Sequence, residues 1–228
     1  MPFQDLPARL AEVTERIERS RSRGGYGQSV TIVAVTKTYG PDAPAAAWDA
    51  GVRDVGENRI QEAIPKISAV RVPLRWHLVG HLQRNKVKQI DGFHLVHSMD
   101  SPRLADALAA HGVVRARPID VLLQLNVSGE GSKGGYVLEG LEAEGERLLA
   151  VPGLVVRGVM TMAPFGADDA TLRVVFGGAR TAVEALRSCG HAQAVELSMG
   201  MSGDYEIAVE EGATLVRLGT VLFEERTA

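Results

Sequence analysis

Apolar residues recur in two patterns that alternate along the chain. Short continuous runs, such as Ile-Val-Ala-Val at residues 32–35, are typical of strands buried on both faces of a parallel sheet. Longer segments with apolar residues three and four apart, such as Leu6, Leu10, Val13 and Ile17, predict amphipathic helices. The alternation of the two patterns predicts parallel strands joined by right-handed helical crossovers.

Eight segments have the strand pattern, and no linker divides them. The predicted strands cover residues 32–35, 52–55, 74–79, 93–96, 119–127, 154–160, 194–197 and 214–218. The predicted helices cover residues 6–19, 43–50, 58–70, 83–90, 101–111, 137–149, 171–188 and 204–211. We therefore predict one α/β domain over residues 1–228, a (β/α)8 TIM-type barrel with an extra N-terminal helix. An open, doubly wound sheet is the alternative.

Composition and charge limit the classes of function that the chain is expected to have. The chain has 228 residues and a formal net charge of −3, which gives no general attraction to nucleic acid or acidic membranes. A single cysteine, Cys189, excludes an internal disulfide and a multi-cysteine metal site. The N-terminus lacks the apolar region of a signal peptide, and no apolar run approaches the ~18 residues of a membrane span. A cytoplasmic protein is expected.

The first strand ends at a lysine, Lys37, and Gly40-Pro41 then opens a connection. Parallel α/β proteins place their chemistry at the carboxyl ends of strands. Apolar walls around an amine favour its neutral form, which can condense with an aldehyde or a ketone. The alternative is a lysine that ends the strand in solvent.

Closure of a barrel would place Lys37 beside the end of the last strand and the loop before the last helix, residues 197–204. Glycines there let backbone N–H groups approach an oxyanion, and hydroxyl side chains add donors. These residues are Gly200, Gly203, Gly219, Ser202 and Thr220. Ser202 is expected to begin the last helix, and capping that helix alone is its structural alternative. The pattern predicts a phosphate site.

An amine beside a phosphate site suggests a phosphorylated aldehyde, and pyridoxal 5′-phosphate (PLP) is the commonest such cofactor. Arg217 ends the last strand and, as a permanent cation, would keep the ring nitrogen unprotonated. Its alternative is a surface ion pair with Glu210 or Glu211. Asn58 could bind the ring oxygen, or it could cap the helix that follows it.

Other polar stretches also follow predicted strands. They cover residues 55–62, 76–86, 97–101, 126–135 and 157–164. His77 and His97 alternate within apolar strands and are predicted to be satisfied core histidines rather than bases. Met160 and Met162 are predicted to pack under a ring. The basic residues Arg84, Lys86 and Lys88 are predicted to form a solvated helix face, with a second phosphate or PLP site as the minority alternative.

Residues 197–202, 216–220 and 76–86 together resemble the pyridoxal-phosphate homeostasis protein family, small single-domain relatives of the alanine racemase barrel. The resemblance covers residues 31–223. It implies an internal aldimine between PLP and one lysine, and a set of surrounding ligands. That set is Lys37 for the aldimine, Ser202, Gly219 and Thr220 with Gly200 and Met201 around the phosphate, Arg217 at the pyridine nitrogen and Asn58 near the ring. Arg59, His81 and Glu224 differ from residues frequent in the family.

Family members bind PLP without established turnover and are thought to buffer or deliver it, with effects on amino-acid and keto-acid balance. Related racemases add a C-terminal β-domain, for which a chain ending at Ala228 leaves no room. The resemblance therefore implies a non-enzyme whose partners are PLP and apo PLP-dependent enzymes, and a monomer that binds neither nucleic acid nor membrane. Three alternatives remain open: a PLP-dependent racemase or lyase, a sugar-phosphate aldolase using Lys37, and a binding module acting through residues 84–88.

Overall fold

The computed structural model describes residues 3–127 and 134–224. Within them, eight parallel strands close into one barrel, in which each strand pairs with its neighbours in sequence and β8 pairs with β1. The strands are β1 (Thr31–Val35), β2 (Asp54–Glu57), β3 (Arg75–Leu78), β4 (Leu95–Met99), β5 (Ile119–Leu125), β6 (Leu154–Thr161), β7 (Glu196–Ser198) and β8 (Leu215–Leu218).

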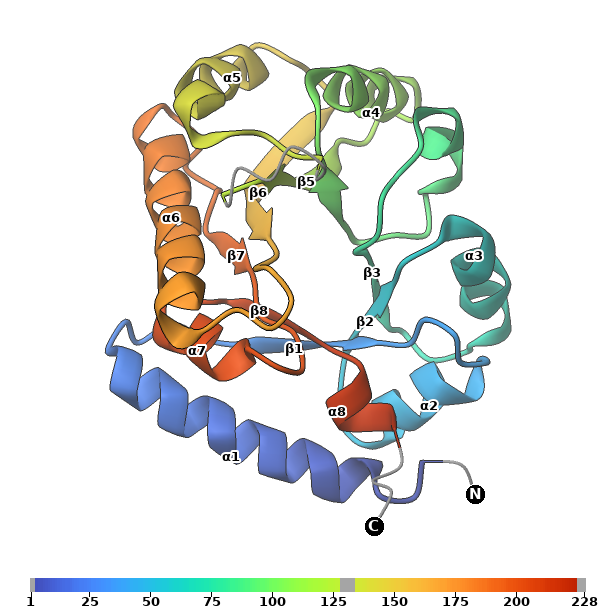
Figure 1. The fold of residues 1–228 in the computed structure, drawn as a ribbon. Coiled ribbons are helices and arrows are strands. Elements are labelled where there is room, and N and C mark those ends of the chain that lie inside the picture. Colours follow the sequence, from blue (N-terminus) through green and yellow to red (C-terminus); the bar gives the residue numbers. More distant parts are fainter. Residues whose placement is uncertain (1–2, 128–133, 225–228) are drawn as a thin grey trace.

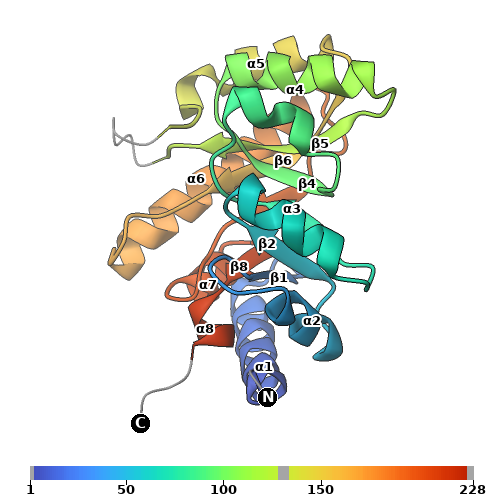
Figure 2. The same cartoon turned by 90° about the vertical axis from the view of Figure 1, so that its right-hand side faces the viewer.

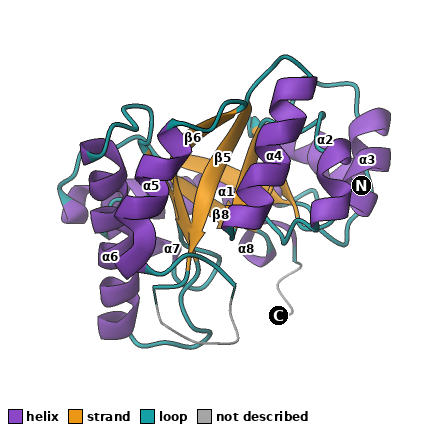
Figure 3. Ribbon diagram, turned by 90° about the horizontal axis from the view of Figure 1, so that it is seen from above, coloured by secondary structure: helices purple, strands orange, loops and turns teal. Residues whose placement is uncertain are grey.

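Helices surround the strands (Figures 1 and 3). They are α1 (Leu6–Gly24), α2 (Asp42–Asp49), α3 (Ile60–Ala69), α4 (Pro102–Val114), α5 (Leu141–Leu149), α6 (Asp169–Ser188), α7 (Tyr205–Glu210) and α8 (Thr220–Phe223). Short 3₁₀ helices cover Arg84–Gln89 and Leu138–Gly140. None of the helices in the described part of the chain is long and apolar enough to cross a membrane.

The barrel and the extra N-terminal helix are confirmed, and the open sheet is wrong. Three details of the prediction also differ. The expected α-helix over residues 83–90 is a 3₁₀ helix, and the short helix α8 was not predicted. The second, fourth and seventh strands begin two residues later than expected, at Asp54, Leu95 and Glu196. β2 also ends two residues later than expected, at the buried carboxylate of Glu57, which an apolar pattern does not mark as strand.

The barrel interior holds an apolar layer with polar residues next to it. One apolar cluster takes a single residue from each of five strands and none from a helix, so it lies inside the barrel: Val33, Leu95, Leu122, Met160 and Leu215. Two residues further along β4 and β8, and therefore on the same faces, stand His97 and Arg217. The larger apolar core fills the layer between the strands and the helices.

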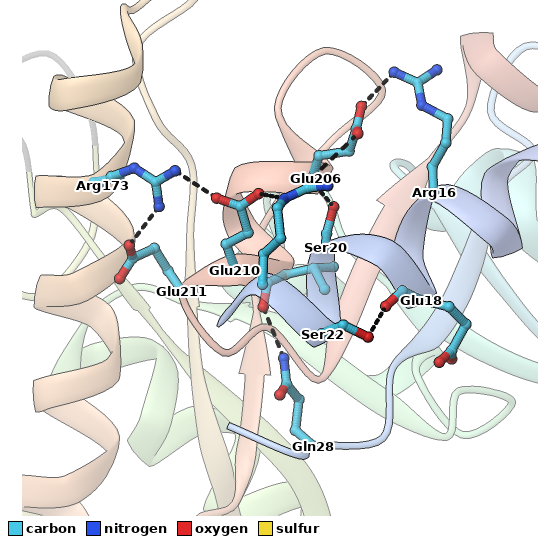
Figure 4. Close-up of polar contacts among 11 residues, drawn as sticks. Arg16, Glu18, Ser20, Ser22, Gln28, Arg173, Glu206, Glu210 and Glu211 are labelled. Carbon is cyan, nitrogen blue, oxygen red and sulfur yellow. Dashed lines mark hydrogen bonds and ion pairs between the residues drawn. The ribbon is translucent and has the colours of Figure 1, made fainter. Parts of the chain in front are cut away.

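Helix α1 lies outside the barrel, next to α7 and α8 (Figure 2). It runs further than predicted and ends at Gly25, whose φ of 75° suits the left-handed C-terminal position of a helix. Ion pairs tie it to α7: Arg16 bonds Glu206, and Glu210 in turn binds Arg173 on α6 (Figure 4). These ion pairs link α1 to α7 and α7 to α6, and α7 is the helix that connects β7 to β8.

Candidate cofactor-binding site

The ends of β1, β2 and β8 meet at the carboxyl edge of the barrel. Val35 pairs with Gly56 in the β1–β2 register, so Lys37 and Asn58 each follow by two residues. A Cβ built on Gly219 would lie 3.5 Å from the Val35 carbonyl oxygen. The structure therefore brings the backbone before Lys37 beside the loop after β8, as barrel closure predicts. Lys37 itself is exposed, so the expectation that apolar walls enclose it is wrong.

The predicted phosphate loops are joined to each other. The amide of Arg217 donates to the Gly200 carbonyl at 2.9 Å, and the Ser202 hydroxyl accepts from the amide of Val221 at 3.3 Å. Ser202 therefore neither begins nor caps the helix predicted over residues 204–211, because that helix, α7, starts at Tyr205 with Asp204 as its N-cap residue. Its hydroxyl instead reaches the first turn of α8, whose early amides have no partner within the helix.

Gly200 and Met201 shape the turn between β7 and α7. Gly200 has a φ of +90°, and a Cβ there would lie 2.6 Å from that of Ala208, so this position requires glycine. The Met201 amide donates to Asp204 Oδ1 at 2.6 Å. Burial raises the pKa of Asp204, although this hydrogen bond and the charge of Arg217 oppose the rise. The exposed Met201 side chain leaves the turn open to solvent.

Arg217 is buried in the barrel and does not form a surface ion pair. Its Nη1 donates to Ser198 Oγ at 2.7 Å, and its Nη2 donates to the Thr161 carbonyl at 2.9 Å. Burial lowers the pKa of Arg217 to about 10, so it stays charged at neutral pH. The alternative partners, Glu210 and Glu211, bind Arg173 instead. A buried guanidinium aimed by fixed contacts fits a donor to a ligand atom.

Asn58 does not cap the helix that follows it. Arg59 occupies the N-cap position of α3 and makes no side-chain capping bond. Asn58 is half-buried, and its backbone packs so closely on Gly80 that a Cβ at Gly80 would lie 2.2 Å from the Asn58 oxygen. The capping alternative is therefore wrong, and the side chain's role at a ring remains a prediction.

A buried polar cluster lies beneath Lys37, and the sequence did not predict it. Lys66 Nζ donates to Glu57 Oε1 and to the Thr36 carbonyl, both at 2.8 Å, while the Thr36 hydroxyl donates to Glu57 Oε1 at 2.6 Å. On the other side of Lys37, Thr38 has a φ of +70°, a strained conformation for a β-branched residue. The backbone on both sides of Lys37 is thus held in a defined conformation.

His77 and His97 are core histidines with hydrogen-bonded rings, as predicted. Met160 packs in the barrel, whereas Met162 is 39% exposed, and the packing of both under a ring stays a prediction. Sequence reasoning missed Asp54, which stands at the start of β2. A lone aspartate beside an apolar run gave no signal that it would be buried.

The basic residues behave as a solvated surface. Arg84 and Lys88 are exposed and Lys86 is half-buried, on a 3₁₀ helix rather than on an α-helix. His81 at the same rim pairs with Asp100 at 2.9 Å. The minority alternative, a second phosphate or PLP site on these residues, stays open. In the polar stretch 126–135, residues 128–133 lie outside the described part of the chain.

Asp54 makes the fold sensitive to acid. Burial alone would raise its pKa, but hydrogen bonds from His77 and Arg75 lower it to about 2. The unfolded chain binds this proton more tightly than the folded chain does. At pH values above the ordinary aspartate pKa, the carboxylate therefore stabilises the fold by about 2 kcal/mol. That contribution should disappear as pH falls through about 2. Urea unfolding from pH 5 to pH 2 should show wild type and Asp54→Asn converging; parallel curves would contradict the assignment.

Sequence and structure comparisons identify this kind of barrel. The family model of the alanine racemase N-terminal domain matches residues 9–227. The fold also matches alanine racemase of Corynebacterium glutamicum with a TM-score of 0.75 at 15% identity, over 100% of this chain and 63% of that one. The fold and the residues at its mouth thus define an alanine-racemase-type barrel.

The family follows from more similar relatives. The chain is 38% identical over 221 residues to the pyridoxal phosphate homeostasis protein of Aquifex aeolicus, covering 96% of this chain and 97% of that protein. It is 36% identical to PipY of Synechococcus elongatus PCC7942, whose structure with PLP bound matches with a TM-score of 0.83 over 96% and 99% of the two chains. The chain belongs to the pyridoxal phosphate homeostasis protein family.

Proposed function

We propose that this protein binds PLP at the carboxyl end of its barrel and acts in PLP homeostasis, by buffering the cofactor and delivering it to apo-enzymes. One observation carries the proposal. Gly219 packs against Val35, so a lysine-bearing strand end lies beside glycine and hydroxyl loops. The related PipY has been solved with PLP bound, which supports the same ligand here.

The residues present fit the chemistry of PLP. Bound PLP supplies an aldehyde for a lysine amine and a phosphate that needs N–H and O–H donors. The exposed Lys37 amine is the proposed attachment point. The proposed phosphate ligands are Ser202, Gly219 and Thr220, with Gly200 and Met201 shaping the adjoining turn. Arg217 would donate to the ring nitrogen and Asn58 would lie near the ring.

The remaining parts of the proposal concern the protein's setting. We place it in the cytoplasm as a monomer and as one domain over residues 1–228, with apo PLP-dependent enzymes as recipients and no nucleic-acid partner. No residue is assigned an acid or base role in turnover. A permanent cation at the ring nitrogen keeps that nitrogen unprotonated, which weakens the ring as an electron sink for carbanion chemistry.

A transfer assay tests this function. Protein loaded with PLP and freed of unbound ligand should restore the activity of an apo PLP-dependent enzyme, while Lys37→Ala treated identically should not. Recovery equal to that of a sample without protein would overturn delivery. The loaded protein should also leave the optical rotation of L-alanine unchanged. Steady loss of rotation that requires Lys37 would instead establish a racemase.

A further inference from the structure

A chain of hydrogen bonds crosses the barrel interior and ends on Arg217. Arg217 Nη1 donates to Ser198 Oγ at 2.7 Å, and Ser198 Oγ lies 2.9 Å from His97 Nδ1. His97 Nε2 lies 2.8 Å from His77 Nδ1, and His77 Nε2 lies 2.9 Å from Asp54 Oδ1. These five residues, the polar relay, come from five different strands.

The two ends of the relay determine its direction. Arg217 can only donate hydrogen bonds, and the Asp54 carboxylate can only accept them. Ser198 accepts from Arg217 and so has its own O–H free to donate to His97 Nδ1. His97 then carries its proton on Nε2 and donates to His77, which likewise carries its proton on Nε2. With neutral histidines, only this arrangement satisfies every contact.

The surroundings disfavour an additional proton. His97 is fully buried, and burial, together with the positive charge of Arg217, holds its pKa well below the usual range. A proton there would place a second cation near Arg217 in a low-dielectric interior. Asp54 is meanwhile held by Arg75, whose Nε and Nη2 donate to its two oxygens at 2.7 and 2.6 Å. Hydrogen bonds therefore hold both ends of the relay in place, Asp54 through Arg75 and Arg217 through the Thr161 carbonyl.

We propose that Ser198, His97 and His77 are positioning residues that hold the Arg217 guanidinium in place as a hydrogen-bond donor toward the ligand. Every donor in the relay points from Arg217 toward Asp54, so the relay offers no proton to the ligand atom that Arg217 faces. The identity of the ligand rests on the proposed function. With PLP as the ligand, its ring nitrogen accepts a hydrogen bond from Arg217 and carries no proton. The relay thus gives a structural reason for the fixed orientation of Arg217 inside the barrel.

Nitrogen NMR of the PLP-free protein tests the relay without the cofactor. In histidine labelled with ¹⁵N, His77 and His97 should both be neutral with the proton on Nε2. In Asp54→Asn the far end can donate as well as accept, so both rings should populate the two tautomers. His97 protonated on Nδ1 in wild type, or tautomers unaffected by Asp54→Asn, would overturn the relay.

PLP labelled at its ring nitrogen tests the consequence. The bound ring should give the shift of an unprotonated acceptor in wild type, and Ser198→Ala, which removes one anchor of Arg217, should move that shift. The matched control is His94→Gln: this ring lies with its centroid 5.6 Å from that of His77 but is not part of the relay. An unchanged shift in Ser198→Ala would overturn the positioning role. Failure of PLP to bind wild type would overturn the proposed function and leave the tautomer result standing.

Discussion

Replacing Lys37 with alanine is expected to abolish retention of PLP through gel filtration while leaving the fold intact. The amine is the proposed attachment point, and nearby Lys66 cannot replace it because its Nζ is buried on Glu57 and Thr36. Since Lys37 is exposed, its truncation should change the free energy of unfolding by no more than about 0.5 kcal/mol. Visible absorption after gel filtration, together with urea unfolding, measures both effects.

The matched control for this variant is Lys86→Ala, which removes a lysine from the rim outside the proposed site. It should retain PLP as wild type does. If Lys37→Ala kept its visible absorption, or if Lys86→Ala lost as much PLP as Lys37→Ala, the attachment point would lie elsewhere on the barrel.

Lys66→Met is expected to cost about 3–5 kcal/mol of the free energy of unfolding, because it leaves a buried carboxylate without its cation. The side chains of Lys66 and Glu57 are 8% and 0% exposed, and 2.8 Å separates Nζ from Oε1. Glu57 Oε2 is also buried and accepts no hydrogen bond within the described residues. Chemical denaturation in urea measures the loss.

Two comparisons make this prediction specific. The double variant Glu57→Gln with Lys66→Met removes both charges and should recover part of the loss. Arg19→Met breaks the exposed pair between Arg19 and Glu15, whose side chains are 61% and 69% exposed, and should cost less than about 1 kcal/mol. Equal losses of unfolding free energy for Lys66→Met and Arg19→Met would show that the buried pair contributes no more to stability than the exposed pair.

The sequence predicted the architecture because apolar periodicity is a local property. Alternating runs identified strands and helices, and eight such units favoured a closed barrel. Closure alone predicted that the end of β1 meets the end of β8, and the contact of Gly219 with Val35 agrees with this. The part of the site that depends on topology was therefore predictable before any coordinates.

The polar interior was not predictable, because it depends on partners far apart in the chain. The buried Asp54 carboxylate is paired with His77, and the buried Glu57 carboxylate is paired with Lys66. No feature of the neighbouring sequence marks either carboxylate as buried. The same limit explains Ser202, which resembles an N-cap of the helix after it in sequence but accepts a hydrogen bond from Val221 in the first turn of α8. The likeness of His77 and His97 to core histidines was visible, whereas their connection to Arg217 required the fold.

The most direct test of the central claim is to locate the reduced adduct. Wild-type protein incubated with PLP should be treated with borohydride, digested, and examined by peptide mass spectrometry. The account predicts one dominant phosphopyridoxyl group, on the peptide containing Lys37. An unmodified Lys37 peptide, or a dominant label on Lys66, Lys86 or Lys88, would contradict it.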